Sequence, residues 1–185
     1  MGKRIVVGIS GASGVIIGIR TAQALAEGGC EVHVILTDAA RRVIDEEVGK
    51  GFAFLPKITV HRENDAASAL NSTSFLIDAM VLVPCSVKSL AALASGYANN
   101  LLIRCADGAL RTGKRLVVVP RETPLSLSAL ENMVSLRKDG AIIMPPCAAY
   151  YHKPKTVDDM TDFFVGKILD LLGIENKLYR RWRDE

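Results

Sequence analysis

The chain has 185 residues, of which 49% are apolar and 23% are charged. This length fits a single domain over residues 1–185 with a C-terminal tail over 173–185, and the apolar content excludes a long disordered chain. The net charge is only +3, and the one dense basic run, at 179–183, is half cancelled by two acidic residues, which argues against a nucleic-acid partner. No apolar run reaches the ~18 residues of a membrane span.

The four cysteines and three histidines do not form a metal-binding pattern. No two cysteines make a CxxC pair, and the histidines are scattered along the chain. No signal peptide precedes the first apolar run. We therefore expect a cytoplasmic, reduced protein that binds no metal.

Short β-branched runs alternate with segments of helical spacing. The pattern predicts strands over residues 4–9, 31–36, 79–83, 116–119 and 141–144, and a short strand near 58–60. It predicts helices over residues 15–27, 37–48, 86–95, 99–110, 126–138 and 157–172. Residues 64–74 are the most loop-like stretch. Such alternation predicts an α/β fold in which a parallel sheet has helices on both faces.

In a sheet of this kind, ligands bind at the carboxyl ends of the strands. This rule selects the segments 10–14, 37–38, 84–89, 120–123 and 145–151. Four of the five segments contain Ser, Thr or Arg, which are the side chains that an anionic ligand requires.

Residues 8–14 read GISGASG and lie between the first strand and the first helix. Small residues let backbone N–H groups approach an anion at a helix N-terminus. The pattern is neither GxGxxG nor a P-loop, so it favours a mononucleotide phosphate over a dinucleotide. The alternative is a tight turn that binds nothing.

Two further strand ends carry polar groups. Ser86 can cap the next helix, and together with Ser89 and free amides it can bind a second part of the same ligand. Cys85 is expected to be a buried small apolar residue rather than a nucleophile. Arg121 and Glu122 are either a surface ion pair or an anion-binding Arg beside a proton-handling Glu.

The remaining polar and aromatic residues give weaker signals. His33 alternates within a strand and is expected to be a satisfied core residue, whereas His61 is expected in a loop without a partner. His152 is expected to be exposed in a turn that also carries a phenol. Trp182 either packs the tail against the domain or lies in an interface.

Taken together, these segments resemble the flavin prenyltransferase family of the UbiX type. The resemblance covers nearly the whole chain and rests on GISGASG at 8–14, PCSVKS at 84–89, NLLIRCAD at 100–107, PRETP at 120–124 and IMPPCAAYYHKP at 143–154. It implies a Rossmann-like (flavodoxin-like) flavoprotein that is not itself a decarboxylase.

The resemblance also implies a reaction. A dimethylallyl group passes from dimethylallyl phosphate to N5 and C6 of reduced FMN, and the prenylated FMN is handed to a UbiD-type decarboxylase. No metal takes part. The enzyme is expected to be a homododecamer built from trimers, with active sites shared between subunits.

The matching motifs imply a role for each site residue. The FMN-binding residues are Gly11, Ala12, Ser13, Thr37, Ser86, Val87, Lys88, Ser89 and Arg121. The residues that hold the allylic phosphate, some of them from a neighbouring subunit, are Arg104, Arg111, Glu122, Tyr151 and Lys167. The resemblance implies two catalytic residues: Ser13 beside the reacting flavin and Glu122 as a proton relay.

The sequence departs from the family pattern at several positions, and Thr37 for Ser and Ser89 for Thr keep the hydroxyl. Arg111 stands where relatives often carry Lys, which keeps the charge but changes the geometry. Ala66 and Ala67 are small where some relatives place a Trp towards the prenyl chain. The prenyl packing is therefore expected to differ from that of those relatives.

Three other functions are compatible with parts of the sequence. The first is a non-catalytic FMN carrier or accessory subunit of an aromatic acid decarboxylase. The second is a flavoenzyme like phosphopantothenoylcysteine decarboxylase, although the PASANT-type turn and the substrate clamp of those enzymes are missing. The third is an NAD-dependent oxidoreductase with Asp38 as its ribose acid, which the lack of GxGxxG disfavours.

Overall fold

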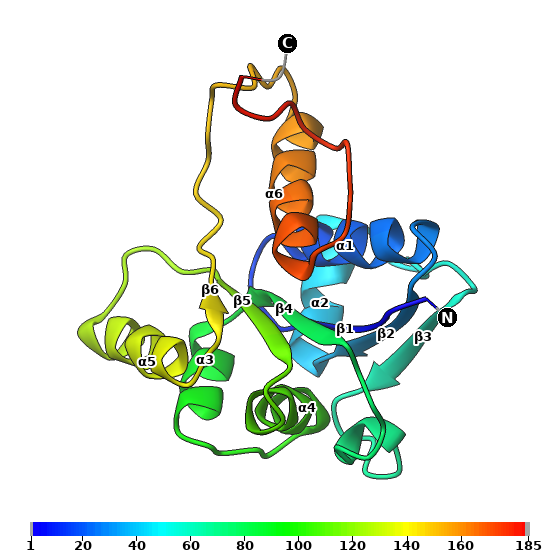
Figure 1. The fold of residues 1–185 in the computed structure, drawn as a ribbon, viewed down its shortest axis with the longest axis vertical. Helices are drawn as coiled ribbons and strands as arrows, with labels where there is room; N and C mark the ends of the chain where they lie inside the picture. Colours follow the sequence, from blue (N-terminus) through cyan, green and yellow to red (C-terminus); the bar gives the residue numbers. More distant parts are fainter. Residues whose placement is uncertain (1, 184–185) are drawn as a thin grey trace.

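Six parallel strands form the centre of the structure, a computed structural model that describes residues 2–183 (Figure 1). In the order β3-β2-β1-β4-β5-β6, the strands are β1 (Arg4–Ile9), β2 (Glu31–Leu36), β3 (Ile58–Arg62), β4 (Ala79–Cys85), β5 (Arg115–Pro120) and β6 (Ile142–Ile143). The strand order reverses between the neighbouring strands β1 and β4, because the chain returns from β3 at one edge to β4 at the centre. Such a switch point is where α/β sheets open a crevice for ligands.

Helices cover both faces of the sheet. They are α1 (Val15–Glu27), α2 (Asp38–Glu47), α3 (Val87–Ala94), α4 (Leu101–Arg111), α5 (Leu127–Lys138) and α6 (Val157–Leu172), with a short 3-10 helix η1 (Ala69–Asn71). One apolar core lies between the sheet and α1, α2 and α6, and a second lies between the sheet and α3, α4 and α5. This arrangement confirms the predicted α/β fold.

The strands are as apolar as a sheet covered on both faces requires. All seven residues of β4 are buried, and so are the last five residues of β1, β2 and β5. Odd and even residues of a strand face different cores: Val7 packs under α1 and α6, whereas Val6 packs under α4. Aliphatic side chains therefore fill both cores, and few aromatic residues are needed.

The structure corrects three predicted segments. The edge strand β3 runs to Arg62 because it stays paired with β2 as far as Leu36. The expected loop over 64–74 contains η1, whose first N–H groups are capped by Ser68. The last strand is shorter than predicted, with only Ile142 and Ile143 pairing with β5.

The chain after β6 leaves the sheet and reaches the far end of α6, and the segment after α6 returns alongside that helix (Figure 1). Thr156 and Asp159 form a capping box at the start of α6. Near the other end of α6, the Asp170 carboxylate accepts hydrogen bonds from the Tyr179 hydroxyl (2.6 Å) and from Arg181 (2.6 Å). Among residues 2–183, no helix has the length and apolarity needed to cross a membrane.

Candidate functional site

A cavity of about 300 Å³ lies at the carboxyl ends of β1, β2, β4 and β5. Its lining residues come from the segments that follow those four strands. They are Gly11, Ala12, Thr37, Ala39, Ser86, Val87, Lys88, Ser89, Arg121 and Glu122. All of them except Ala39 are residues that the sequence singled out.

Ser10 joins the two central loops of this cavity. Its side chain is fully buried, and its hydroxyl accepts a hydrogen bond from the Ser86 N–H (2.7 Å) and donates one to the Pro84 carbonyl (2.9 Å). The Ser10 N–H also donates to the Pro84 carbonyl (3.2 Å). The loop after β1 is therefore fixed against the loop after β4.

The hydroxyl groups at the cavity keep hydrogens for a ligand. Ser86 Oγ accepts from the Ser89 N–H (3.3 Å) and donates to Ser89 Oγ (3.1 Å), so the Ser89 hydroxyl hydrogen is left for another acceptor. Thr37 Oγ1 accepts from the Ala40 N–H (3.0 Å), so the Thr37 hydroxyl hydrogen is also left for another acceptor. Since the first N–H groups of a helix have no intrahelical partner, those of α3 add further donors at this wall.

Gly11 lets the loop after β1 approach the start of α2. A Cβ at Gly11 would collide with the Cβ of Ala39. The sequence analysis did not select Ala39, although it is a small residue two positions after Thr37. This close approach requires a glycine at position 11 and a small residue at position 39.

The cavity carries one negative and two positive side chains. Arg121 and Lys88 bring positive charge, and Glu122 lies beside Arg121. The Arg121 N–H donates to the Cys85 carbonyl (3.0 Å), and Glu122 Oε1 accepts from the Thr123 N–H (3.0 Å). Burial raises the pKa of the Cys85 thiol, so this thiol stays protonated, as expected for an unreactive apolar residue.

The N-terminus of α1 binds a carboxylate from the chain itself. Glu47, at the end of α2, accepts hydrogen bonds from the N–H groups of Gly14 (2.9 Å) and Val15 (3.2 Å). Gly14 has φ 87°, a left-handed conformation that suits glycine. Glu47 therefore satisfies these two amides, and a phosphate at the predicted loop 8–14 would have to use other N–H groups.

Five predicted site residues lie outside the lining of this cavity. Ser13 is exposed beside it. Arg104 and Arg111 are on α4, where Arg104 Nε donates to the Asn71 carbonyl (3.1 Å) and Arg111 pairs with Asp107 (2.7 Å).

Tyr151 and Lys167 lie on the side of the sheet that α6 covers, opposite the side that α4 covers. Tyr151 packs edge-on against Phe163 and Trp182, and Lys167 is 6.0 Å from the Tyr179 ring. Arg104 also borders a separate hollow of about 170 Å³ that Ala66 lines.

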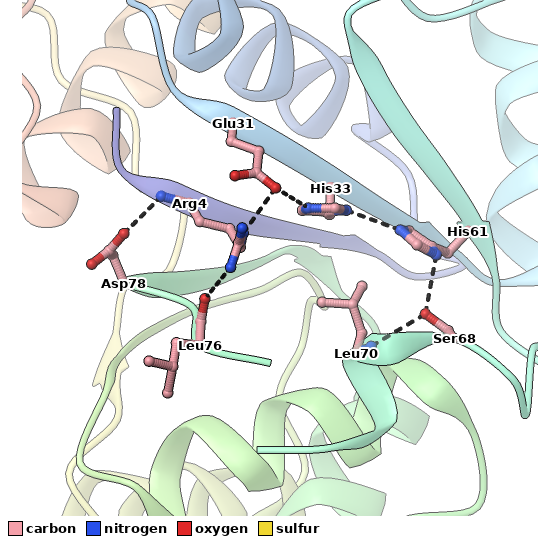
Figure 2. Close-up of polar contacts among 8 residues, drawn as sticks. All are labelled: Arg4, Glu31, His33, His61, Ser68, Leu70, Leu76 and Asp78. Atoms are coloured by element: carbon pink, nitrogen blue, oxygen red, sulfur yellow. Dashed lines mark hydrogen bonds and ion pairs between the residues drawn. The ribbon is translucent and has the colours of Figure 1, made fainter. Parts of the chain in front are cut away.

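A chain of hydrogen bonds connects β1, β2 and β3 to the segment before η1 (Figure 2). His33 lies 3.0 Å from Glu31 and 3.1 Å from His61, and His61 lies 3.1 Å from the Ser68 hydroxyl. Glu31 also accepts from Arg4 (2.8 Å). When both rings carry a single N–H, His33 donates to the Glu31 carboxylate, which only accepts; His61 then donates to His33, and Ser68 donates to His61.

This network confirms that His33 is a satisfied residue and corrects the prediction for His61. His61 belongs to β3 and has two hydrogen-bonding partners. The network begins at Arg4 and Glu31, the first residues of their strands, and so lies away from the cavity at the carboxyl ends. Within residues 2–183, no group of three or more His, Cys, Asp or Glu side chains is placed to hold a metal ion.

Comparison with known proteins agrees with this geometry. The family model described as Flavoprotein matches residues 1–169, so the fold and the cavity define an α/β flavoprotein. The chain is 46% identical to the flavin prenyltransferase UbiX of Saccharolobus solfataricus over 98% of this chain and 92% of that protein. The chain belongs to the flavin prenyltransferase UbiX family.

Two solved structures have nearly the same fold. The crystal structure of AnUbiX (PadA1) in complex with FMN and dimethylallyl pyrophosphate has a TM-score of 0.93 and 38% identity, and the match covers 100% of both chains. A dodecameric FMN-dependent UbiX-like decarboxylase from Escherichia coli O157:H7 has a TM-score of 0.91 and 37% identity, covering 98% of this chain and 100% of that chain. These matches confirm the family that the sequence motifs indicated.

Proposed function

We propose that the protein is a metal-independent flavin prenyltransferase that joins a dimethylallyl group from dimethylallyl phosphate to N5 and C6 of reduced FMN. The observation that carries the proposal is the single cavity that collects nine of the residues expected from the family motifs. In this proposal residues 1–185 form one FMN-binding domain, with 173–185 as its tail. The product goes to a UbiD-type decarboxylase.

The cavity has the chemistry that a flavin mononucleotide requires. Its volume of about 300 Å³ is at the lower end of the range of roughly 300–1,000 Å³ for small-molecule sites. The Thr37 and Ser89 hydroxyls and the first turn of α3 supply donors, and Arg121 and Lys88 supply positive charge. Gly11, Ala12 and Ala39 line the cavity with small residues, beside which we propose that the flavin ring lies.

Reduced FMN supplies the nucleophile when it is bound. In the proposed mechanism, Arg104, Arg111 and Lys167 hold the allylic phosphate and stabilise the negative charge that grows as its C–O bond breaks. Tyr151 donates a hydrogen bond to the same phosphate. The departing phosphate would act as the base, and Glu122, at the cavity, would relay the proton. Ser13 lies at the mouth of the site and orients the reacting groups.

The positions of the phosphate-binding residues support an active site shared between subunits. Arg104 and Arg111 lie on α4, whereas Lys167 lies on α6, and the sheet separates these two helices. Together with Tyr151, these three residues therefore need a second copy of the chain to converge on one phosphate.

Exposed apolar side chains support an assembly, and we propose a homododecamer. Leu127 is 71% exposed, Tyr150 75% and Val157 83%, and they lie on α5, on the segment after β6 and on α6. Contiguous apolar patches mark protein–protein contacts, and we propose that these side chains belong to such contacts in the assembly. The four cysteines are free thiols, which fits the reducing cytoplasm where we propose that the enzyme acts.

The test is an anaerobic incubation of the purified protein with FMN, dithionite and dimethylallyl phosphate, followed by mass spectrometry of the released flavin. A flavin heavier by one dimethylallyl unit is the expected result. Tight FMN binding with no change in mass would favour the carrier function instead. A second incubation with dimethylallyl diphosphate distinguishes the two donors.

A further inference from the structure

Glu63 lies between two helices of the candidate site. It is the first residue after β3, and the pairing of Leu36 with Arg62 places it beside Thr37, the residue after β2. Figure 1 shows the segment that follows β3 running next to α4. Glu63 is not among the residues that line the cavity.

The Glu63 carboxylate accepts a hydrogen bond at each oxygen. Oε1 accepts from the Asp38 N–H (2.7 Å), the first amide of α2, and Oε2 accepts from Asn100 Nδ2 (2.6 Å). The Glu63 carbonyl accepts from the Leu101 N–H (2.8 Å), the first amide of α4. A negative charge at these positions is favoured by the dipoles of both helices.

Both contacts affect residues of the candidate site. Asp38 follows Thr37, whose hydroxyl caps α2 and whose side chain lines the cavity. Asn100 uses its amide nitrogen for Glu63, so its Oδ1 faces α4 and accepts from the Ile103 N–H (3.0 Å).

The second contact extends along α4 to Arg104. This residue follows Asn100 by one helical turn, and its N–H donates to the Asn100 carbonyl (2.9 Å). Glu63 therefore fixes the start of α2, which carries Thr37 towards the flavin, and the start of α4, which carries Arg104.

We propose that Glu63 is a positioning residue that fixes the flavin side and the phosphate side of the active site relative to each other. This inference rests on the proposed function, because it takes Thr37 as a flavin contact and Arg104 as a phosphate contact. Glu63 lies outside the lining of the FMN cavity and borders the hollow of about 170 Å³ beside Arg104. In this proposal it acts through the starts of α2 and α4.

Glu63→Gln tests the proposal because Gln has one acceptor oxygen where Glu has two. Its amide nitrogen would then face a donor, either the Asp38 N–H or Asn100 Nδ2. If the Asn100 amide flips to accept, its nitrogen faces the Ile103 N–H and the cap of α4 is lost. Every arrangement leaves one donor unpaired.

Asn100→Asp provides the complementary change. Alone, it brings two carboxylates together, because the introduced acid would face Glu63 across the 2.6 Å contact. Combined with Glu63→Gln, it restores each donor–acceptor pair and the original net charge. The double variant should thus restore the contacts that each single variant loses.

The experiment measures the FMN dissociation constant by flavin fluorescence and the KM for dimethylallyl phosphate in the anaerobic assay. Each single variant is expected to raise both values about tenfold, the loss that one unpaired polar group produces. The double variant is expected to return both values close to those of the wild type. Glu46→Gln, an exposed carboxylate on α2, is the control and should leave both values unchanged.

Single variants that melt earlier yet keep wild-type FMN affinity and KM would overturn the proposal, since a purely structural residue gives that result. A double variant as impaired as the two singles together would also overturn it. If Glu63→Gln does not fold, Glu63→Asp, which is too short to reach both donors, replaces it. A wild-type protein that binds FMN but yields no heavier flavin would overturn the proposed function, while the FMN measurements would still test Glu63.

Discussion

Removal of the Ser10 hydroxyl should separate the two central loops of the cavity. In Ser10→Ala the Ser86 N–H loses its 2.7 Å acceptor and the Pro84 carbonyl loses a 2.9 Å donor, at a position with no exposure to solvent. A buried donor left unpaired costs about 1–3 kcal/mol, so we expect the free energy of unfolding to fall by about 2–3 kcal/mol. For a domain of this size, that change lowers Tm by about 4–12 °C.

Thermal unfolding followed by circular dichroism measures this change, and flavin fluorescence measures FMN binding in the same variant. Ser95→Ala is the matched control, because it removes an exposed hydroxyl that donates to the Ala92 carbonyl at 3.2 Å. FMN affinity should fall in Ser10→Ala and stay constant in the control. A Tm within about 1 °C of the control, the usual range for surface changes, would refute the reasoning.

Three further predictions concern the cavity and the histidine network. Gly11→Ala should push the loop away from Ala39 and weaken FMN binding about tenfold or more in a fluorescence titration. Glu122→Gln should lower prenylation turnover about a hundredfold with unchanged FMN affinity, and full turnover would favour a carrier. Burial, with a smaller contribution from His33, lowers the pKa of His61, so folding favours the neutral ring. The contribution of the neutral His61 ring to the free energy of unfolding should be fully present above about pH 6.5 and should decrease below it. Denaturant titrations should show a smaller decrease in His61→Gln.

The fold and most of the cavity could be predicted because they depend on short segments. Each strand end brings its own polar residues, and a parallel sheet places all of the carboxyl ends at one edge. Ser86 and Arg121 could therefore be assigned to the same site from their positions after β4 and β5.

The residues that the sequence did not indicate act through contacts distant in the chain. Glu47 reaches the start of α1 from the end of α2, 33 residues away from Gly14. Glu63 depends on the register of an edge strand that the sequence predicted only in part. His61 was expected in a loop because its partner, His33, becomes adjacent only when β2 and β3 pair.

The two carboxylates also explain how the site separates structural anions from ligand anions. The helices α1, α2 and α3 each begin just after a central strand, so each directs the positive end of its dipole towards the same edge of the sheet. Glu47 satisfies the start of α1. Glu63 binds only the first amide of α2, and Thr37 and Ala39 line the cavity together with the start of α3, which is capped by the neutral Ser86. The helices α2 and α3 therefore both direct their N-termini towards the cavity. Because Glu47 satisfies the start of α1, we propose that the anion of a mononucleotide binds at the starts of α2 and α3 rather than at the start of α1.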